Sequence, residues 1–341
     1  METKIFGPDE PINIAEPLDT WLSAGLRDYA VPEAVGSSSR VFLLKDHTFA
    51  GEYADYPAIK IMRPDQQQYA LPLFKHEVRI LDRMRHVPGV TPMLALGFLR
   101  VDSGAWPSEI APITATLESK ASARQLHGSM DLMKPEEVEV FLSEIDARVA
   151  DAWLAFIILS RRWEDNLFLR CDAGYTRGEF RRTFPVSQAL QIASQICQII
   201  QAAHERDIVY LDHKALHYYW NEPRQQVFVL DWNIGRQISS SDQKDMIKFD
   251  LLQFSARALH HMLTGRQASG SVNVGPNKPE DIQNAPDKYE PVWTYDDHER
   301  LTEDELNFLS VALQGEFKTA LELENGLQAL YQARQSKAGV G

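Results

Sequence analysis

Cysteine is scarce in this 341-residue chain, which contains only Cys171 and Cys197. Two cysteines, of which Cys197 falls inside a helical pattern, give neither a readable disulfide framework nor a cluster of zinc ligands. A chain that does not rely on disulfides fits a reducing compartment. We therefore predict a cytoplasmic location.

Long hydrophobic runs and a surplus of basic residues are also absent. The longest apolar run covers residues 152–159, which is far too short to span a bilayer, and the N-terminus has no basic head followed by an apolar core. The 35 Lys and Arg residues face 48 Asp and Glu residues, which gives a net charge of −13. Binding along a nucleic acid needs many cations to displace counterions. The sequence therefore predicts neither a membrane nor a nucleic acid as a partner.

Hydrophobic residues make up 44% of the chain, which is enough to build two packed lobes. The most informative stretch is 208–236, where two short apolar runs each end on an aspartate, Asp212 and Asp231. A turn signal at 221–223 predicts that the two runs fold back on each other and bring both carboxylates to one cleft. Lys214 follows the first aspartate. Two carboxylates and an ammonium group suit phosphoryl transfer from a nucleotide.

The same stretch resembles the catalytic loop and metal-binding turn of the protein kinase superfamily, HRDxKxxN followed by DFG. Tyr-Leu-Asp at 210–212 stands at HRD, Lys214 at the loop lysine, His217 at the asparagine, and Asp-Trp-Asn at 231–233 stands at DFG. The resemblance implies that Asp212 and Lys214 are catalytic and that Asp231 and His217 lie at the metal. It also implies ATP and Mg²⁺ as cofactors.

Two segments nearer the N-terminus resemble the nucleotide-binding part of the same family. The segment 34–44, AVGSSSRVFLL, reads as strand, small-residue turn and strand, and it is similar to the glycine-rich loop with only its middle glycine kept. Small residues allow backbone amides to approach phosphates closely, so Gly36, Ser38 and Ser39 are candidate nucleotide-binding residues. An ordinary hairpin turn is the alternative reading of this segment.

Lys60 and Glu77 form the second part of this resemblance. Lys60 lies on an alternating strand at 56–62, and Glu77 lies in the middle of the apolar stripe of a predicted helix at 71–86. A glutamate on a buried helix face needs a cation, and a lysine on the preceding strand would satisfy it. The pair matches the strand lysine and helix glutamate of kinases, which implies that Lys60 binds ATP phosphates and that Glu77 orients it.

Together with the remaining segments, the resemblance implies an α+β protein with a bilobal protein kinase-like fold. The smaller lobe would hold a small antiparallel sheet and one helix, and the larger lobe would be mainly helical. We predict a lead-in segment at 1–28, a β-rich lobe at 29–159 with an insertion at about 101–152, and a helical lobe at 160–337. A helix from Pro135 is expected within the insertion. Asp250 opens a helix similar to the central helix of the family's large lobe, where it would brace the catalytic loop. Residues 266–300 are expected to form a surface connection.

Several positions depart from the family pattern. His217 offers a nitrogen where the family has an amide oxygen, and nitrogen is a poor ligand for magnesium. Leu211 replaces the arginine that would contact a phosphorylated segment, so no such switch is expected. His213 and His217 could instead form a transition-metal pair. The alternative is that one imidazole packs inside the protein and the other faces solvent. No helix is expected at these two histidines.

Three functions fit these observations. The first is an ATP-dependent phosphotransferase resembling protein serine/threonine kinases, which transfers the γ-phosphoryl group to a hydroxyl of a protein or small molecule. The second is a pseudokinase that binds a nucleotide or a protein with little turnover. The third is a small-molecule kinase, which the helix from Asp250 disfavours because it looks more like that of a protein kinase.

Overall fold

The computed structural model describes residues 38–43, 57–63, 67–101, 128–160, 166–172, 184–239, 241–272, 274 and 282–338. The chain divides into two compact units. The first unit comprises Met1–Arg85 and Thr91–Arg161, and the second comprises His86–Val90 and Arg162–Gly341.

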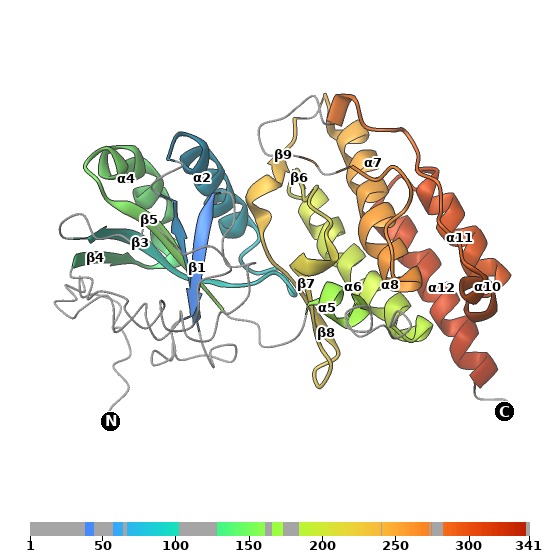
Figure 1. The fold of residues 1–341 in the computed structure, drawn as a ribbon. Coiled ribbons are helices and arrows are strands. Elements are labelled where there is room, and N and C mark those ends of the chain that lie inside the picture. The colour runs from blue at the N-terminus through green and yellow to red at the C-terminus, as the bar shows by residue number, and fades with distance from the viewer. Residues whose placement is uncertain are drawn as a thin grey trace, which may run out of the picture. The chain divides into compact units, whose positions relative to one another are not determined.

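The described residues of the first unit form a five-stranded antiparallel sheet in the order β1-β2-β5-β3-β4 (Figure 1). Its strands are β1 (Ser39–Leu43), β2 (Pro57–Met62), β3 (Met93–Val101), β4 (Gly128–Met133) and β5 (Leu154–Ser160). The strand predicted at 56–62 is confirmed as β2. Because β2 is an inner strand, Lys60 is paired with Val41 of β1 on one side and with Ile157 of β5 on the other.

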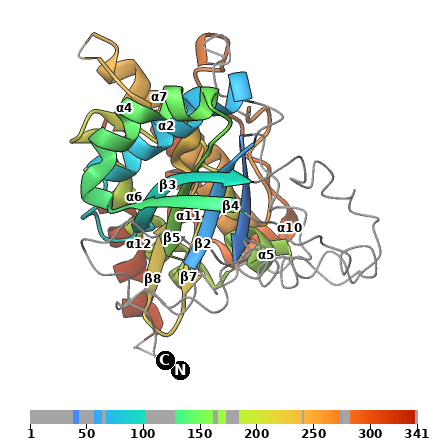
Figure 2. The ribbon, with the colours of Figure 1, turned by 90° about the vertical axis from the view of Figure 1, so that its left-hand side faces the viewer.

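Two helices of the first unit, α2 (Gln67–Arg83) and α4 (Val138–Ala150), lie side by side against the sheet (Figures 1 and 2). Helix α2 begins at Gln67 rather than at the predicted residue 71, and its predicted apolar stripe is buried. A 3₁₀ turn, η3 (Pro135–Glu137), precedes α4 and confirms the predicted start at Pro135. The described part of segment 101–152 thus builds β4 and α4.

Helix α4 buries one apolar face. The buried residues on this face are Val138, Phe141, Leu142, Ile145 and Val149. The rings of Phe98 and Phe141 stack with their centroids 4.7 Å apart, which joins α4 to β3.

The second unit is mainly helical, with α6 and α12 packed along each other. Its helices are α5 (Leu167–Asp172), α6 (Val186–His204), α7 (Gln243–Phe254), the π-helical segment η7 (Ser255–Leu259), α8 (His260–Thr264), α10 (Tyr295–Arg300), α11 (Glu303–Leu313) and α12 (Ala320–Ala338). Among the described residues, no helix is both long and apolar enough to cross a membrane. The small sheet and the helical remainder confirm the predicted α+β class.

Two short antiparallel pairs carry the stretch from residue 208 to 237. Strand β6 (Ile208–Val209) pairs with β9 (Arg236–Gln237), and β7 (Tyr218–Asn221) pairs with β8 (Gln226–Val229). The turn predicted at 221–223 is confirmed. Asn221 stabilises it, because its side-chain oxygen accepts a hydrogen bond from the Arg224 amide at 3.0 Å.

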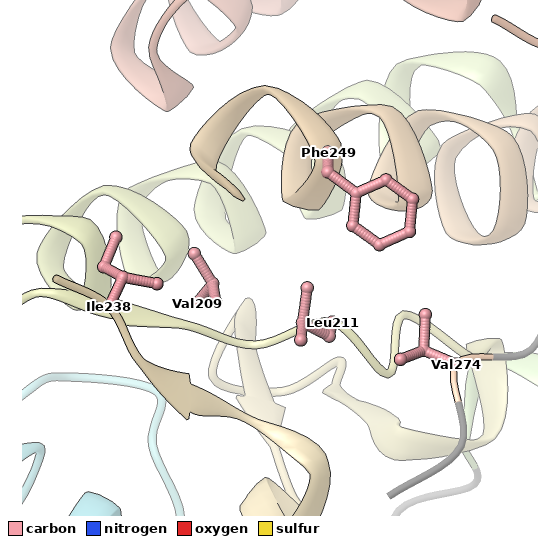
Figure 3. Close-up of a cluster of buried hydrophobic side chains, with 5 residues drawn as sticks. All are labelled: Val209, Leu211, Ile238, Phe249 and Val274. Carbon is pink, nitrogen blue, oxygen red and sulfur yellow. The ribbon is translucent and has the colours of Figure 1, made fainter. Parts of the chain in front are cut away.

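A buried apolar cluster joins the end of β6 to helix α7 (Figure 3). Its residues are Val209, Leu211, Ile238, Phe249 and Val274. The side chain of Leu211 lies in this cluster and is fully buried. The position where the family resemblance expects an arginine is therefore part of the core.

The segment 266–300 is only partly a surface connection. It contains α10, and the carboxylate of Asp297 is buried and accepts hydrogen bonds from Thr294 and Arg266. The preceding helix α8 ends at Gly265, which adopts the left-handed conformation with φ of 73°. A capping box of Thr302 with Glu305 begins helix α11.

Candidate functional site

Lys60 and Glu77 form a buried ion pair in the first unit. Lys60 lies on β2, an inner strand of the sheet, and the helical period of α2 places Glu77 on the buried face of that helix. The Lys60 Nζ lies 2.7 Å from a Glu77 carboxylate oxygen, and the side chains are only 6% and 1% exposed. The predicted pairing is confirmed. Such a pair fixes an ammonium group in a set direction, which suits it to hold an anion.

The candidate phosphate-binding loop is only partly described. Ser38 and Ser39 are buried at the start of β1, where the Ser38 carbonyl accepts a hydrogen bond from the Arg63 amide at 3.0 Å. Gly36 lies outside the described residues. The nucleotide-binding role of these three residues stays a prediction.

The second unit brings Asp212, His217 and Asp231 together. One possible ligand atom from each of these residues lies within 4.8 Å of the other two. Asp212 and His217 are buried, whereas the Asp231 side chain is 34% exposed. The β7–β8 hairpin thus confirms the predicted approach of the two aspartates.

The predicted loop lysine lies against the first aspartate. The Lys214 Nζ donates a hydrogen bond to the Asp212 carboxylate at 2.9 Å. Lys214 is 29% exposed, so its ammonium group keeps contact with solvent while it neutralises a buried carboxylate.

Arg257 approaches the same carboxylate and was not singled out in the sequence. It lies on the π-helical segment η7, and its Nη1 is 3.7 Å from Asp212 Oδ1. Burial lowers the pKa of Arg257, and the charge of Asp212 opposes that shift. π-Helical turns are rare and occur frequently at functional sites. A buried arginine inside an apolar helical pattern was the available signal, because such a charge needs a partner.

Asp250 holds the backbone that leads into Asp212. Its two carboxylate oxygens accept hydrogen bonds from the amides of Leu211 and Tyr210 at 2.6 and 3.2 Å, which confirms the predicted brace. They also accept from the imidazole Nε2 atoms of His204 and His213, each at 2.8 Å. Burial would raise the pKa of Asp250, but the two imidazoles hold it well below its usual range.

The brace supports an unusual backbone conformation. Leu211 has φ of 66° and Asp231 has φ of 58°, values that ordinary side chains rarely adopt. The Tyr210 hydroxyl donates a hydrogen bond to the Leu230 carbonyl at 2.6 Å. Tyr210 therefore does more than pack: it ties the segment before Asp212 to the residue before Asp231.

The two histidines differ in their contacts, and neither faces solvent. His213 Nδ1 lies 2.5 Å from the Tyr218 hydroxyl and its Nε2 lies 2.8 Å from Asp250, so both nitrogens are engaged inside the protein. His217 belongs to the 3₁₀ turn η5 (Ala215–His217) and is also buried. The predicted solvent-facing imidazole is therefore wrong. As expected, no helix holds both histidines, because η5 begins at Ala215, after His213. Because both ring nitrogens of His213 are already hydrogen-bonded, His213 cannot form a transition-metal pair with His217.

The donors in the second unit fit magnesium only in part. A carboxylate oxygen of Asp231 suits this hard ion, whereas the imidazole nitrogen of His217 does not. The ammonium group of Lys60 fits the phosphates of ATP.

Comparison with known proteins supports the fold. No protein-family model matches the sequence, and no curated protein matches it. Among solved structures, the kinase PK-1 of Cydia pomonella granulovirus matches with a TM-score of 0.50 and 14% sequence identity, over 85% of this chain and 90% of that chain. At this identity the likeness concerns the fold. The chain therefore has a protein kinase-like fold, with a small antiparallel-sheet unit and a mainly helical unit.

Proposed function

We propose that the protein is an ATP-dependent phosphotransferase that transfers the γ-phosphoryl group of ATP to a hydroxyl group. The buried Lys60–Glu77 pair carries this proposal. A buried ion pair seldom improves stability over apolar residues of similar size, because removing two charges from water costs more than their attraction returns. An oriented lysine beside a nucleotide, by contrast, has a direct use.

The residues have distinct roles in this proposal. Lys60 binds ATP phosphates, and Glu77 orients it without touching the nucleotide. Asp231 supplies an oxygen ligand for a divalent cation, which would offset phosphate charge when bound. Asp212 accepts the proton of the attacking hydroxyl, and Lys214 offsets charge on the group in transfer.

Two observations support a role for Asp212 as a proton acceptor. Lys214 and Arg257 both lie near its carboxylate, at 2.9 and 3.7 Å, and Asp250 fixes the backbone just before it. A general base must be held within reach of the proton that it removes, so its position matters as much as its basicity. The arrangement restrains Asp212 from both its backbone and its side chain.

A pseudokinase is the second candidate, and the buried Leu211 favours it. In the apolar cluster of Figure 3, Leu211 cannot make the ionic contact of the arginine that the family resemblance expects there. A chain that binds ATP without forming ADP would fit this alternative. The proposal specifies the phosphate acceptor only as a protein or small molecule that carries a hydroxyl group.

The test is a thermal shift of the purified full chain with ATP, with and without Mg²⁺ or Mn²⁺, followed by measurement of ADP formation. A ligand that binds only the folded state raises the melting temperature. We expect ATP to raise it, Lys60→Ala to abolish that rise, and Asp231→Asn to abolish the part that depends on the cation. Lys75→Ala is the matched control, because Lys75 forms an exposed ion pair with Asp146 on the surface of the same unit. No rise at millimolar ATP would contradict the proposal.

A further inference from the structure

His217 is oriented as a metal ligand in the second unit. Its Nδ1 lies 3.0 Å from the backbone carbonyl of Asp212, to which a protonated Nδ1 donates. This hydrogen bond leaves the lone pair on Nε2, which lies 3.6 Å from an Asp231 carboxylate oxygen. Histidines that bind metals commonly donate their second ring nitrogen to a carbonyl or carboxylate in this way, which fixes the tautomer and the ring orientation.

The separation of the two donor atoms also suits one small ion. Two cis ligands that each lie about 2.1 Å from an ion in an octahedral arrangement, which Mn²⁺ prefers, are about 3.0 Å apart. The Nε2–carboxylate distance of 3.6 Å exceeds that value by about 0.6 Å, so a small rotation of the partly exposed Asp231 side chain would bring both donors to one ion. Asp231 is 34% exposed, so solvent or phosphate oxygens can reach the remaining coordination positions.

The chemistry of these donors does not favour magnesium. Mg²⁺ takes oxygen ligands almost exclusively and gives up water reluctantly, whereas imidazole nitrogen binds the softer first-row ions well. Carboxylates and phosphates suit Mn²⁺ as they suit Mg²⁺, and Mn²⁺ is also the first member of the transition-ion series that binds mixed nitrogen and oxygen sites. Replacement of an amide oxygen by an imidazole at this position therefore changes which ion the site prefers.

We propose that His217 Nε2 and an Asp231 carboxylate oxygen bind a first-row transition ion, Mn²⁺ in particular, in preference to Mg²⁺. The proposal rests on the proposed function, because nucleotide phosphates would complete the coordination shell. Asp212 remains outside the shell. Its carboxylate accepts a hydrogen bond from Lys214 at 2.9 Å and lies 3.7 Å from Arg257. In the proposed function this carboxylate receives the proton of the acceptor hydroxyl.

The test is a titration of the full chain with Mn²⁺, followed by electron paramagnetic resonance, with Mg²⁺ as the competitor. We expect Mn²⁺ to bind more tightly than Mg²⁺, and His217→Asn to reduce this preference at least about tenfold, as loss of a metal-site group typically does. Asp231→Asn should weaken both ions. His86→Asn is the matched control, because His86 is exposed and belongs to the same unit.

Pulsed electron paramagnetic resonance on the unaltered chain gives a readout that does not depend on whether a variant folds. Bound Mn²⁺ should show magnetic coupling to an imidazole nitrogen, and this coupling should disappear in His217→Asn. Absence of nitrogen coupling in the unaltered chain, or an equal preference in both proteins, would overturn the metal assignment.

A parallel thermal shift with ATP alone separates the two proposals. A shift that depends on Lys60, together with no preference for Mn²⁺, would overturn the metal assignment and keep the phosphotransferase. Nitrogen-coupled Mn²⁺ in a chain that ATP does not stabilise would confirm the ion site and contradict the phosphotransferase.

Discussion

The ammonium group of Lys60 lies 2.7 Å from the Glu77 carboxylate, and neither side chain is more than 6% exposed. Removing one partner leaves an uncompensated buried charge, so Lys60→Met or Glu77→Leu alone should lower the free energy of unfolding by about 3–5 kcal/mol. The double variant removes both charges and should regain most of that loss. Denaturant unfolding of the three variants measures this.

The double variant also separates stability from nucleotide binding. If Lys60 binds phosphates, the double variant should be stable and yet show no thermal shift with ATP. A double variant that still responds to ATP would show that Lys60 has no part in nucleotide binding.

Asp250→Asn should destabilise the second unit. The substitution places an amide group where a carboxylate oxygen now accepts hydrogen bonds, and hydrogen bonds to charged groups contribute about 1.5–3 kcal/mol each. We expect a loss of at least about 2 kcal/mol in denaturant unfolding at pH 7. The low pKa of Asp250 means that its stabilising contribution is present at neutral pH and is lost progressively as the pH falls from the ordinary carboxyl value towards the lower folded value.

Asp245→Asn is the control for this prediction, because Asp245 lies on the same helix and is exposed. Equal stability of the Asp250→Asn and Asp245→Asn proteins would mean that the contacts of Asp250 contribute nothing net to folding.

His260 should make the second unit sensitive to mild acid. Its Nδ1 donates to the Arg266 carbonyl at 2.7 Å, and its Nε2 accepts from the Val292 amide at 3.1 Å, so the buried ring is neutral. Burial lowers the pKa of His260 to about 4, from an ordinary value of 6.5. Stability is then full above pH 6.5 and falls towards pH 4, by up to about 3 kcal/mol.

Unfolding in urea at pH 7 and pH 5 measures this loss. His260→Gln lowers stability at both pH values but should reduce the difference between them, whereas His298→Gln, at an exposed histidine, should not. An unchanged difference in His260→Gln would assign the pH dependence to other groups.

Arg257→Met should impair turnover more than nucleotide binding. The guanidinium lies near Asp212, in the buried part of the second unit, so its loss should disturb the carboxylate rather than the ATP phosphates. Small misplacements of a reacting group can cost up to about a hundredfold in rate. We expect kcat to fall at least about tenfold while the ATP-induced thermal shift is kept, with partial recovery in Arg257→Lys. A fall in ATP binding without a fall in kcat would contradict this positioning role.

Local patterns predicted much of the fold. The alternation of β2, the helical stripe of α2 and the turn before β8 depend on neighbouring residues, so they are readable along the chain. The pairing of Lys60 with Glu77 was also predictable, because each is a charge on a buried face and the two have opposite signs on consecutive elements.

Contacts between distant segments were harder to predict. Arg257, which approaches Asp212, lies on a π-helical turn, and no sequence period reports such a turn. The burial of both His213 and His217 depends on Asp250 and on the backbone of Asp212, which tertiary packing supplies. The resemblance to a family located these segments but did not give their side-chain contacts.

The brace from Asp250 to the amides of Tyr210 and Leu211 has a consequence for synthesis of the protein. The left-handed conformation at Leu211 costs about 1–2 kcal/mol for a residue with a side chain, and its support comes from a residue 39 positions later. A nascent chain that ends before helix α7 lacks that carboxylate. The segment around Asp212 therefore lacks this support until residue 250 has emerged from the ribosome.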